Sequence, residues 1–180
     1  MSYVLITGGA GYIGSHICKK FFDQGFIPVT FDNLSKGNKW SVKWGPLELG
    51  DLSDEKRLKC LFEKYSFIGV IHLAAFSNVE QSCIEPNLYY KNNVIGSLNL
   101  LQKMIEFNVK NIVFSSTAAV YGNPNYLPID EEHPTHPINP YGDTKLTTER
   151  LILNYSKAYE INFISLRYFN VSGSDFLNKI

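Results

Sequence analysis

The residues best suited to chemistry are Tyr141 and Lys145, which lie four positions apart in the segment YGDTK. On a helix this spacing places both side chains on one face, one turn apart. A phenol ordinarily titrates near about 10, and a nearby ammonium stabilises the phenolate, so the pair could act as a general base on an alcohol. The same spacing also occurs by chance on solvated helix faces, so it needs support from elsewhere in the chain.

That support comes from the hydroxyls of Ser115, Ser116 and Thr117, which follow an apolar run expected to form a strand. The carboxyl edge of an open α/β sheet is where such sheets bind ligands. A polar strand end that bonds its own backbone is the plain alternative. With the Tyr–Lys pair downstream, we favour a role for Thr117 in orienting a substrate hydroxyl.

Three glycines near the N-terminus predict a dinucleotide site. Gly8, Gly11 and Gly14 lie three apart, between an apolar run at 4–6 and a helical pattern of apolar residues that begins at Ile13. A strand, a glycine-rich turn and a helix in this order let backbone N–H groups and the positive helix end approach a pyrophosphate.

The next apolar run, 27–31, ends on Asp32. Its distance from the glycines is close to the spacing of about 20 residues at which an acidic side chain meets the adenosine ribose. A carboxylate there accepts hydrogen bonds from both ribose hydroxyls and repels a 2′-phosphate, so NAD is favoured over NADP. The alternative is a plain strand-end turn at Asp32 and Asn33, which the glycine turn upstream makes less attractive.

Alternating strand-like and helix-like segments predict an α/β fold with a doubly wound parallel sheet, in one domain over residues 1–180. We expect strands at 3–7, 27–31, 46–49, 68–74, 110–115 and 162–168, and helices at 12–25, 54–65, 86–107 and 141–159. Residues 122–140 carry five prolines and should form a surface loop near a ligand.

Composition excludes several classes of partner. Lys plus Arg equals Asp plus Glu at 17 each, so the basic stripe that nucleic acid needs is missing, and the partners should be small molecules or protein. No run approaches the length of about 18 apolar residues that a membrane span needs, and no charged segment precedes the first strand. We therefore expect no membrane association and a cytoplasmic location.

Cysteines and histidines do not suggest a metal. Three cysteines without C-x-x-C pairing fit a reducing compartment and packing roles. His16 and His72 fall in an expected helix and strand, where packing or backbone hydrogen bonding is the expected role, and His133 and His136 lie in the proline-rich loop without partners at ligand spacing. We predict no metal site.

Together the motifs resemble the extended short-chain dehydrogenase/reductase family, and within it the UDP-glucose (UDP-galactose) 4-epimerase group. The glycine spacing G-x-x-G-x-x-G is typical of short-chain dehydrogenases. The matching segments occur in family order and cover nearly the whole chain: TGGAGYIGSH at 7–16, DNL at 32–34, GDL at 50–52, HLAA at 72–75, NNVIG at 92–96, FSSTAAVYG at 114–122, YGDTK at 141–145 and LRYFNVSG at 166–173.

The resemblance implies a role for each matching residue. The pyrophosphate would lie against Gly8, Gly11, Tyr12 and Ile13, the adenosine ribose would lie against Asp32 and Asn33, and Asp51 and Leu52 would flank the adenine. Other parts of NAD would border Leu73, Ala74, Ala75 and Asn92. Its nicotinamide end would be surrounded by Ser115, Tyr141, Lys145, Tyr168 and Phe169. The sugar would face Thr117 and Tyr141, and Asn170 would contact the substrate diphosphate side. One departure is Ser77, where many members carry a lysine that contacts phosphate.

The implied reaction is inversion at C4 of a UDP-hexose by oxidation, rotation of a 4-keto sugar and reduction on the other face, with NAD regenerated. Tyr141, its pKa lowered by Lys145 and the charged nicotinamide, would take the proton of the 4-hydroxyl. The related 4,6-dehydratases need an acid and a base after the threonine, and Ala118 and Ala119 stand there instead. Epimerases of other nucleotide sugars stay open.

The resemblance also bears on what the chain lacks and how it assembles. Family members continue into a C-terminal substrate lobe, so we expect this chain to lack that lobe, as a fragment or as a truncated product, and a non-catalytic NAD-binding module is a serious alternative. A purely structural or interaction protein is the less favoured interpretation. The helices near 86–107 and 141–159 are expected to form a homodimer face through Leu98, Leu101, Ile105, Leu151 and Tyr155, unless these residues pack on the chain's own sheet.

Overall fold

The computed structural model describes residues 2–175 and contains a six-stranded parallel sheet of order β3-β2-β1-β4-β5-β6. The strands are β1 (Tyr3–Thr7), β2 (Ile27–Asp32), β3 (Leu47–Leu49), β4 (Phe67–His72), β5 (Asn111–Thr117) and β6 (Asn162–Tyr168). The predicted doubly wound fold is confirmed. Because the order reverses between β1 and β4, the crevice for a ligand lies at the carboxyl ends of these two strands.

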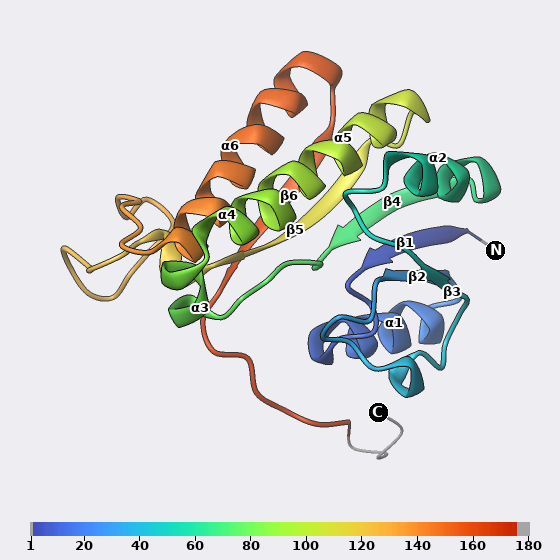
Figure 1. Ribbon diagram of the computed structural model, residues 1–180, viewed down its shortest axis with the longest axis horizontal. Coiled ribbons are helices and arrows are strands. Elements are labelled where there is room, and N and C mark those ends of the chain that lie inside the picture. Colours follow the sequence, from blue (N-terminus) through green and yellow to red (C-terminus); the bar gives the residue numbers. More distant parts are fainter. Residues whose placement is uncertain (1, 176–180) are drawn as a thin grey trace.

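Helices cover both faces of this sheet (Figure 1). Their bounds are α1 (Tyr12–Asp23), α2 (Glu55–Lys64), α3 (Val79–Ile84), α4 (Pro86–Tyr89), α5 (Gly96–Glu106) and α6 (Pro140–Tyr159), with a π-helical turn η2 (Tyr90–Ile95) and 3₁₀ turns η1 (Lys39–Ser41) and η3 (Ala118–Val120). Helix α1 packs on one face, while α2, α5 and α6 pack on the other. The structure adds α3, which the sequence analysis left out.

Two strand ends differ from the prediction by two residues, and the other differences are of one residue. Strand β4 stops at His72 instead of residue 74, so only the first residue of the HLAA segment belongs to the sheet and residues 73–75 follow its end. Strand β5 continues to Thr117 instead of residue 115, because its whole length pairs with β6 up to the pair Thr117 and Tyr168. The hydroxyl residues therefore belong to the strand itself.

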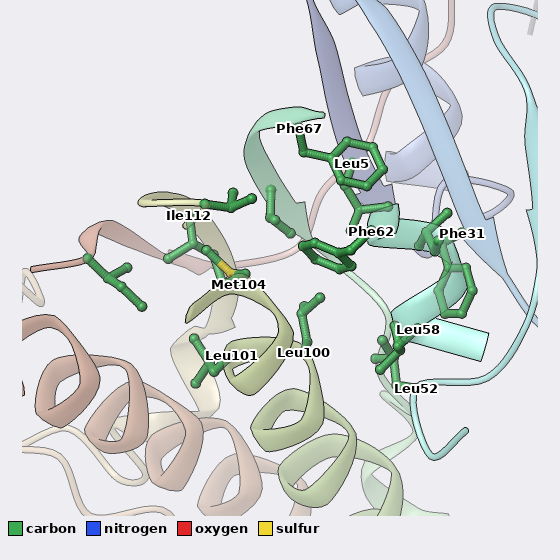
Figure 2. Close-up of a cluster of buried hydrophobic side chains, with 14 of the residues drawn as sticks. Leu5, Phe31, Leu52, Leu58, Phe62, Phe67, Leu100, Leu101, Met104 and Ile112 are labelled. Carbon is green, nitrogen blue, oxygen red and sulfur yellow. The ribbon is translucent and has the colours of Figure 1, made fainter. Parts of the chain in front are cut away.

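The main core lies between the sheet and the α2–α5–α6 layer. Figure 2 shows the side chains of α5, including Leu100 and Met104, facing Leu5 and Ile112 of the sheet and Phe62 of α2. These residues are between 0% and 3% exposed, so this side of α5 is buried as completely as the strand residues that it faces. The rigid layer fixes the carboxyl edge of the sheet on which the site is built.

One residue expected on a homodimer face belongs to this core. Leu101 is 1% exposed and packs against the chain's own sheet, because α5 turns this side inward. Ile105, Leu151 and Tyr155 are partly buried and pack against the same cluster. The expectation that Leu101 contributes to self-association is therefore wrong.

The edge strand β3 is tied to α2 by the buried carboxylate of Glu48. It accepts hydrogen bonds from Arg57 Nη2 at 2.5 Å, from Lys64 Nζ at 2.6 Å and from the Tyr65 hydroxyl at 2.6 Å. Burial alone would raise the pKa of Glu48, but these three hydrogen bonds outweigh it and lower the pKa to about 2. The cluster holds the turn between β3 and α2 in place.

The segment at 122–139 is irregular, as expected, and leads to the capped start of α6. Asn139 Oδ1 accepts a hydrogen bond from the Gly142 N–H at 2.8 Å, and Pro140 occupies the first helical position. Both features are typical of helix starts. No helix within residues 2–175 is long and apolar enough to cross a membrane.

Candidate active site

Two adjoining cavities open at the carboxyl edge of the sheet, and together they contain every residue that the sequence analysis placed in a site. The first has a volume of about 260 Å³, and its lining includes Gly8, Gly11, Tyr12, Asp32, Asn33, Asp51, Leu52, Leu73, Ala74, Ala75 and Asn92. The second has a volume of about 390 Å³, and its lining includes Ile13, Ser115, Thr117, Tyr141, Lys145, Tyr168, Phe169 and Asn170. Gly8, Gly11 and Tyr12 line both, so the glycine turn joins the two cavities.

The glycine turn is built by close backbone contacts that side chains would prevent. Gly8 has a φ of +72°, and its N–H donates to the Phe31 carbonyl at 2.9 Å. A Cβ on Gly14 would lie 2.2 Å from the Gly8 carbonyl oxygen. Helix α1 begins after Gly11 without a side-chain cap. Its first-turn N–H groups therefore suit an anion such as a pyrophosphate.

Asp32 is buried at the end of β2 with each carboxylate oxygen fixed by a backbone N–H. Its Oδ2 accepts from Ala10 at 3.1 Å and its Oδ1 accepts from Leu34 at 2.8 Å. A carboxylate oxygen can accept more than one hydrogen bond, so both oxygens of Asp32 can still accept hydrogen bonds from ribose hydroxyls. The orientation of the side chain is therefore set before a ligand arrives.

The neighbouring loops are linked by Asn33 and Asp51. Asn33 Nδ2 donates to Asp51 Oδ2 at 2.6 Å, while Asp51 Oδ1 accepts from the N–H and the hydroxyl of Ser53. Burial alone would raise the pKa of Asp51, but hydrogen bonds from Ser53 and Asn33 outweigh it and hold the pKa below its usual value. The two strand ends thus form one wall of the first cavity.

Lys145 lies under the second cavity and is almost completely buried, with 3% exposure. Its Nζ donates to the Ser115 carbonyl at 2.7 Å and lies 4.8 Å from the centre of the Phe114 ring. Burial lowers the pKa of Lys145 to about 7, although the charge of Glu149 opposes this. The amine can therefore change its charge near neutral pH.

In the protein alone, Tyr141 does not have the lowered pKa that we expected from Lys145 and the charged nicotinamide together. Burial raises the pKa of the Tyr141 phenol, and the hydrogen bond with Thr117 opposes the rise. Lys145 is directed to the Ser115 carbonyl and is itself partly neutral, so the protein's own groups do not stabilise the phenolate through it. The expected effect of Lys145 is corrected accordingly, while the pairing of Tyr141 with Thr117 is present.

His72 has a structural role, as expected, because it links three elements behind the site. Its Nδ1 bonds the Thr7 hydroxyl at 2.7 Å and its Nε2 bonds the Ser97 hydroxyl at 2.8 Å. Thr7 Oγ1 also accepts from the N–H groups of Leu73 and Ala74. Burial and the charge of Lys145 lower the pKa of His72 to about 3, so the ring is neutral.

Asn93 is a buried link that the sequence analysis missed, although it named the neighbouring Asn92. Its Oδ1 accepts from the Phe76 N–H at 2.9 Å, and its Nδ2 donates to the Phe76 carbonyl at 3.0 Å and to Thr144 Oγ1 at 3.1 Å. It lies in the π-helical turn η2, and such turns often occur at functional sites. The repeated asparagine in NNVIG was the available signal.

Residues 4–179 match the family model described as the NAD dependent epimerase/dehydratase family. The chain belongs to this family. Within the part of the chain that the structure describes, no group of three or more His, Cys, Asp or Glu side chains could hold a metal ion.

Members of the family that resemble the chain include UDP-glucose 4-epimerases from Rhizobium leguminosarum bv. trifolii and Halalkalibacterium halodurans. The first is 44% identical over 177 residues, which is 98% of this chain and 54% of the relative. The second is 47% identical over 172 residues, which is 96% of this chain and 52% of the relative. The chain therefore spans about half the length of the curated relatives it matches.

Solved structures give the same result. The UDP-glucose 4-epimerase of Brucella ovis in complex with NAD superposes with a TM-score of 0.98 at 44% identity, covering 100% of this chain and 55% of that one. The UDP-glucose 4-epimerase of Thermotoga maritima with UDP-glucose superposes with a TM-score of 0.92 at 38% identity, covering 95% and 56%. At these identities the likeness covers both the fold and the family.

Proposed function

We propose that this chain binds NAD and forms the cofactor-binding part of an epimerase that inverts C4 of a UDP-hexose through a transient 4-keto sugar, as in the interconversion of UDP-glucose and UDP-galactose. One observation carries the proposal: Thr117, Tyr141 and Lys145 meet at a cavity that adjoins the cavity lined by the glycine turn and Asp32. The names of the similar proteins support this reaction and substrate.

The residues of the first cavity fit NAD. The uncapped start of α1 suits the pyrophosphate, and the oriented carboxylate of Asp32 suits the ribose hydroxyls while repelling a 2′-phosphate. NAD held there would supply a hydride acceptor for oxidation at the sugar C4 and a hydride donor for reduction on the opposite face. The other residues that line the two cavities, from Asn33 to Asn170, would contact the cofactor and the substrate in the roles that the family resemblance implies.

The protein's own residues would move the proton. Tyr141 would accept the proton of the sugar 4-hydroxyl while the sugar C4–H bond gives up a hydride, and it would return the proton when the 4-keto group is reduced. Thr117 would share the hydrogen bond of that hydroxyl. Because burial raises the pKa of Tyr141, the phenolate needs positive charge beside it. Since the pKa of Lys145 is lowered to about 7 and its Nζ is directed to the Ser115 carbonyl, the oxidised nicotinamide would have to supply that charge.

Dehydration of the sugar is disfavoured. Elimination of water needs an acid and a base beside the substrate-binding threonine. Ala118 and Ala119 follow Thr117 in η3, and neither side chain can transfer a proton. Epimerases that act on other nucleotide sugars have the same requirements at C4 and stay as alternatives.

A second candidate is an NAD-binding module with little turnover, because most of the assigned residues line the cofactor side of the two cavities. Groups that hold the UDP portion provide remote binding energy, which positions the reacting carbon. We therefore expect NAD binding to be retained, and epimerase turnover to lie far below that of a full-length relative. Supplying the rest of a relative, in cis or as a separate chain, should restore turnover that depends on Tyr141.

The test begins with nicotinamide released from the purified protein by denaturation and measured by absorbance and fluorescence. UDP-galactose turnover then separates the epimerase from the module, and Tyr141→Phe should abolish it. Tyr126→Phe is a matched control, because Tyr126 lies in the 122–139 segment and bonds Asp130. Absence of nicotinamide and of NAD affinity would refute both candidates, and turnover that survives Tyr141→Phe would refute the proton-transfer role.

We also propose a cytoplasmic location and a homodimer whose interface does not include Leu101. The three free cysteines suit a reducing compartment. Leu98 and the neighbouring exposed Ile95 remain on α5 and η2 as apolar residues that a second copy could cover.

A further inference from the structure

The start of α6 depends on a residue from another helix. Pro140 has no N–H to satisfy, and the N–H of Gly142 is satisfied by Asn139. The N–H of Tyr141 lies in the first turn, where an α-helix offers no acceptor of its own. It donates to the hydroxyl oxygen of Ser82 at 3.2 Å.

Ser82 is built for this contact. It is 0% exposed in α3, and its hydroxyl donates to the Val79 carbonyl at 2.6 Å. The hydroxyl proton is thus used within α3, and the oxygen keeps its lone pairs for the Tyr141 N–H. The direction of both hydrogen bonds is therefore fixed.

Helix α3 begins directly after the segment at 73–77 that lines both cavities. Asn78 caps it by accepting from the Gln81 N–H at 2.9 Å. Asn93 makes a second, independent connection, because its side chain bonds the backbone of Phe76 and the hydroxyl of Thr144. The cavity-lining segment is thus attached to the first turns of α6 through Asn93, and the helix that follows it is attached through Ser82.

We propose that Ser82 is a positioning residue for Tyr141: its hydroxyl fixes the backbone of Tyr141 and so holds the phenol beside Thr117 at the second cavity. The functional meaning of this role rests on the proposed function, in which Tyr141 transfers the proton. Misplacement of a reacting group by about 1 Å can cost about 100-fold in rate. A backbone anchor directly on the reacting residue is therefore important for catalysis.

The test uses nuclear magnetic resonance of the 180-residue chain and compares the parent protein with Ser82→Ala, Ser82→Thr and Ser156→Ala. Ser156 is the matched control, since it also bonds the carbonyl three residues earlier, that of Leu153 at 2.8 Å, but lies at the far end of α6. Two quantities are measured: exchange of the Tyr141 amide proton, and the nuclear Overhauser effect between the Tyr141 ring and the Thr117 methyl group.

In Ser82→Ala the Tyr141 amide should exchange about 5- to 10-fold faster, as loss of one hydrogen bond predicts, and the Overhauser effect to Thr117 should weaken. The hydroxyl of Ser82→Thr should restore both, and Ser156→Ala should change neither. Unchanged exchange and an unchanged Overhauser effect in Ser82→Ala would overturn the proposal, even if its melting temperature falls. If Ser82→Ala does not fold, Ser82→Cys, with its weaker acceptor, is judged by the same two criteria.

The same samples are titrated with NAD and assayed with UDP-galactose. Absence of both NAD binding and UDP-galactose turnover in the parent protein would refute the proposed function, and the Ser82 contact could still be measured. Normal NAD binding together with an unchanged Tyr141 amide in the variant would refute the role of Ser82 alone.

Discussion

Burial of Lys145 should make the stability of the protein depend on pH in a direction that is unusual for a lysine. Its pKa falls from the usual 10.5 to about 7. Between these values the unfolded chain binds more protons than the folded protein, so the free energy of unfolding rises with pH. Below about pH 7 both forms carry the proton and the contribution no longer changes.

The magnitude follows from the shift. Each unit of pKa corresponds to about 1.4 kcal/mol, so the full effect is roughly 4 to 5 kcal/mol, of which about 3 kcal/mol falls between about pH 7 and about pH 9.5. Lys145→Met removes the amine and keeps a side chain of similar length. The difference in unfolding free energy, parent minus variant, should therefore grow by about 3 kcal/mol over this interval.

Urea denaturation of both proteins at several pH values measures this difference, and titration of the groups that do not interact with Lys145 cancels. Lys110→Met is the matched control, because Lys110 Nζ also donates to a backbone carbonyl, that of Tyr159 at 2.7 Å, in a hydrogen bond that is exposed instead of buried. A constant difference for Lys145→Met, or one that shrinks as pH rises, would contradict the burial argument.

Three further results are expected. Asp32→Ala should narrow the preference for NAD over NADP measured by calorimetry, and equal affinities in the parent protein would rule out the role assigned to Asp32. Glu48→Gln should lower the free energy of unfolding by about 1–2 kcal/mol at neutral pH. Because the pKa of Glu48 is lowered to about 2, this contribution is lost as pH falls from 4.5 towards 2. The acid denaturation curves of the parent protein and the variant should therefore converge in that range. Light scattering at high concentration should show a dimer that Ile95→Glu weakens, and a strictly monomeric parent would count against the α5–α6 interface.

The cofactor side of the site could be predicted from the sequence because its residues follow strand ends directly. Gly8 and Asp32 occupy the carboxyl ends of neighbouring strands β1 and β2, so their chain positions alone determine that they lie at one edge. The spacing of Tyr141 and Lys145 was equally informative, since one helix carries both.

The rest of the site arises from contacts between distant segments. Helix α3 has six residues, too few for an apolar period, and only its cap at Asn78 was a signal. The contact of Ser82 with Tyr141 joins residues 59 positions apart. The buried network around Asn93 likewise depends on how η2 lies against α6, which no local pattern encodes.

Burial also explains why the pKa of Tyr141 is raised in the protein alone, although we expected Lys145 and the charged nicotinamide together to lower it. The spacing of Tyr141 and Lys145 suggested that an ammonium lowers the phenol pKa, but the same low-polarity surroundings act on both groups and favour the neutral form of each. A neutral phenol beside a partly neutral amine is a poor base. Under the proposed function, the additional positive charge must therefore come with the ligand, so proton transfer by Tyr141 is expected to be efficient only when the oxidised cofactor is bound beside it.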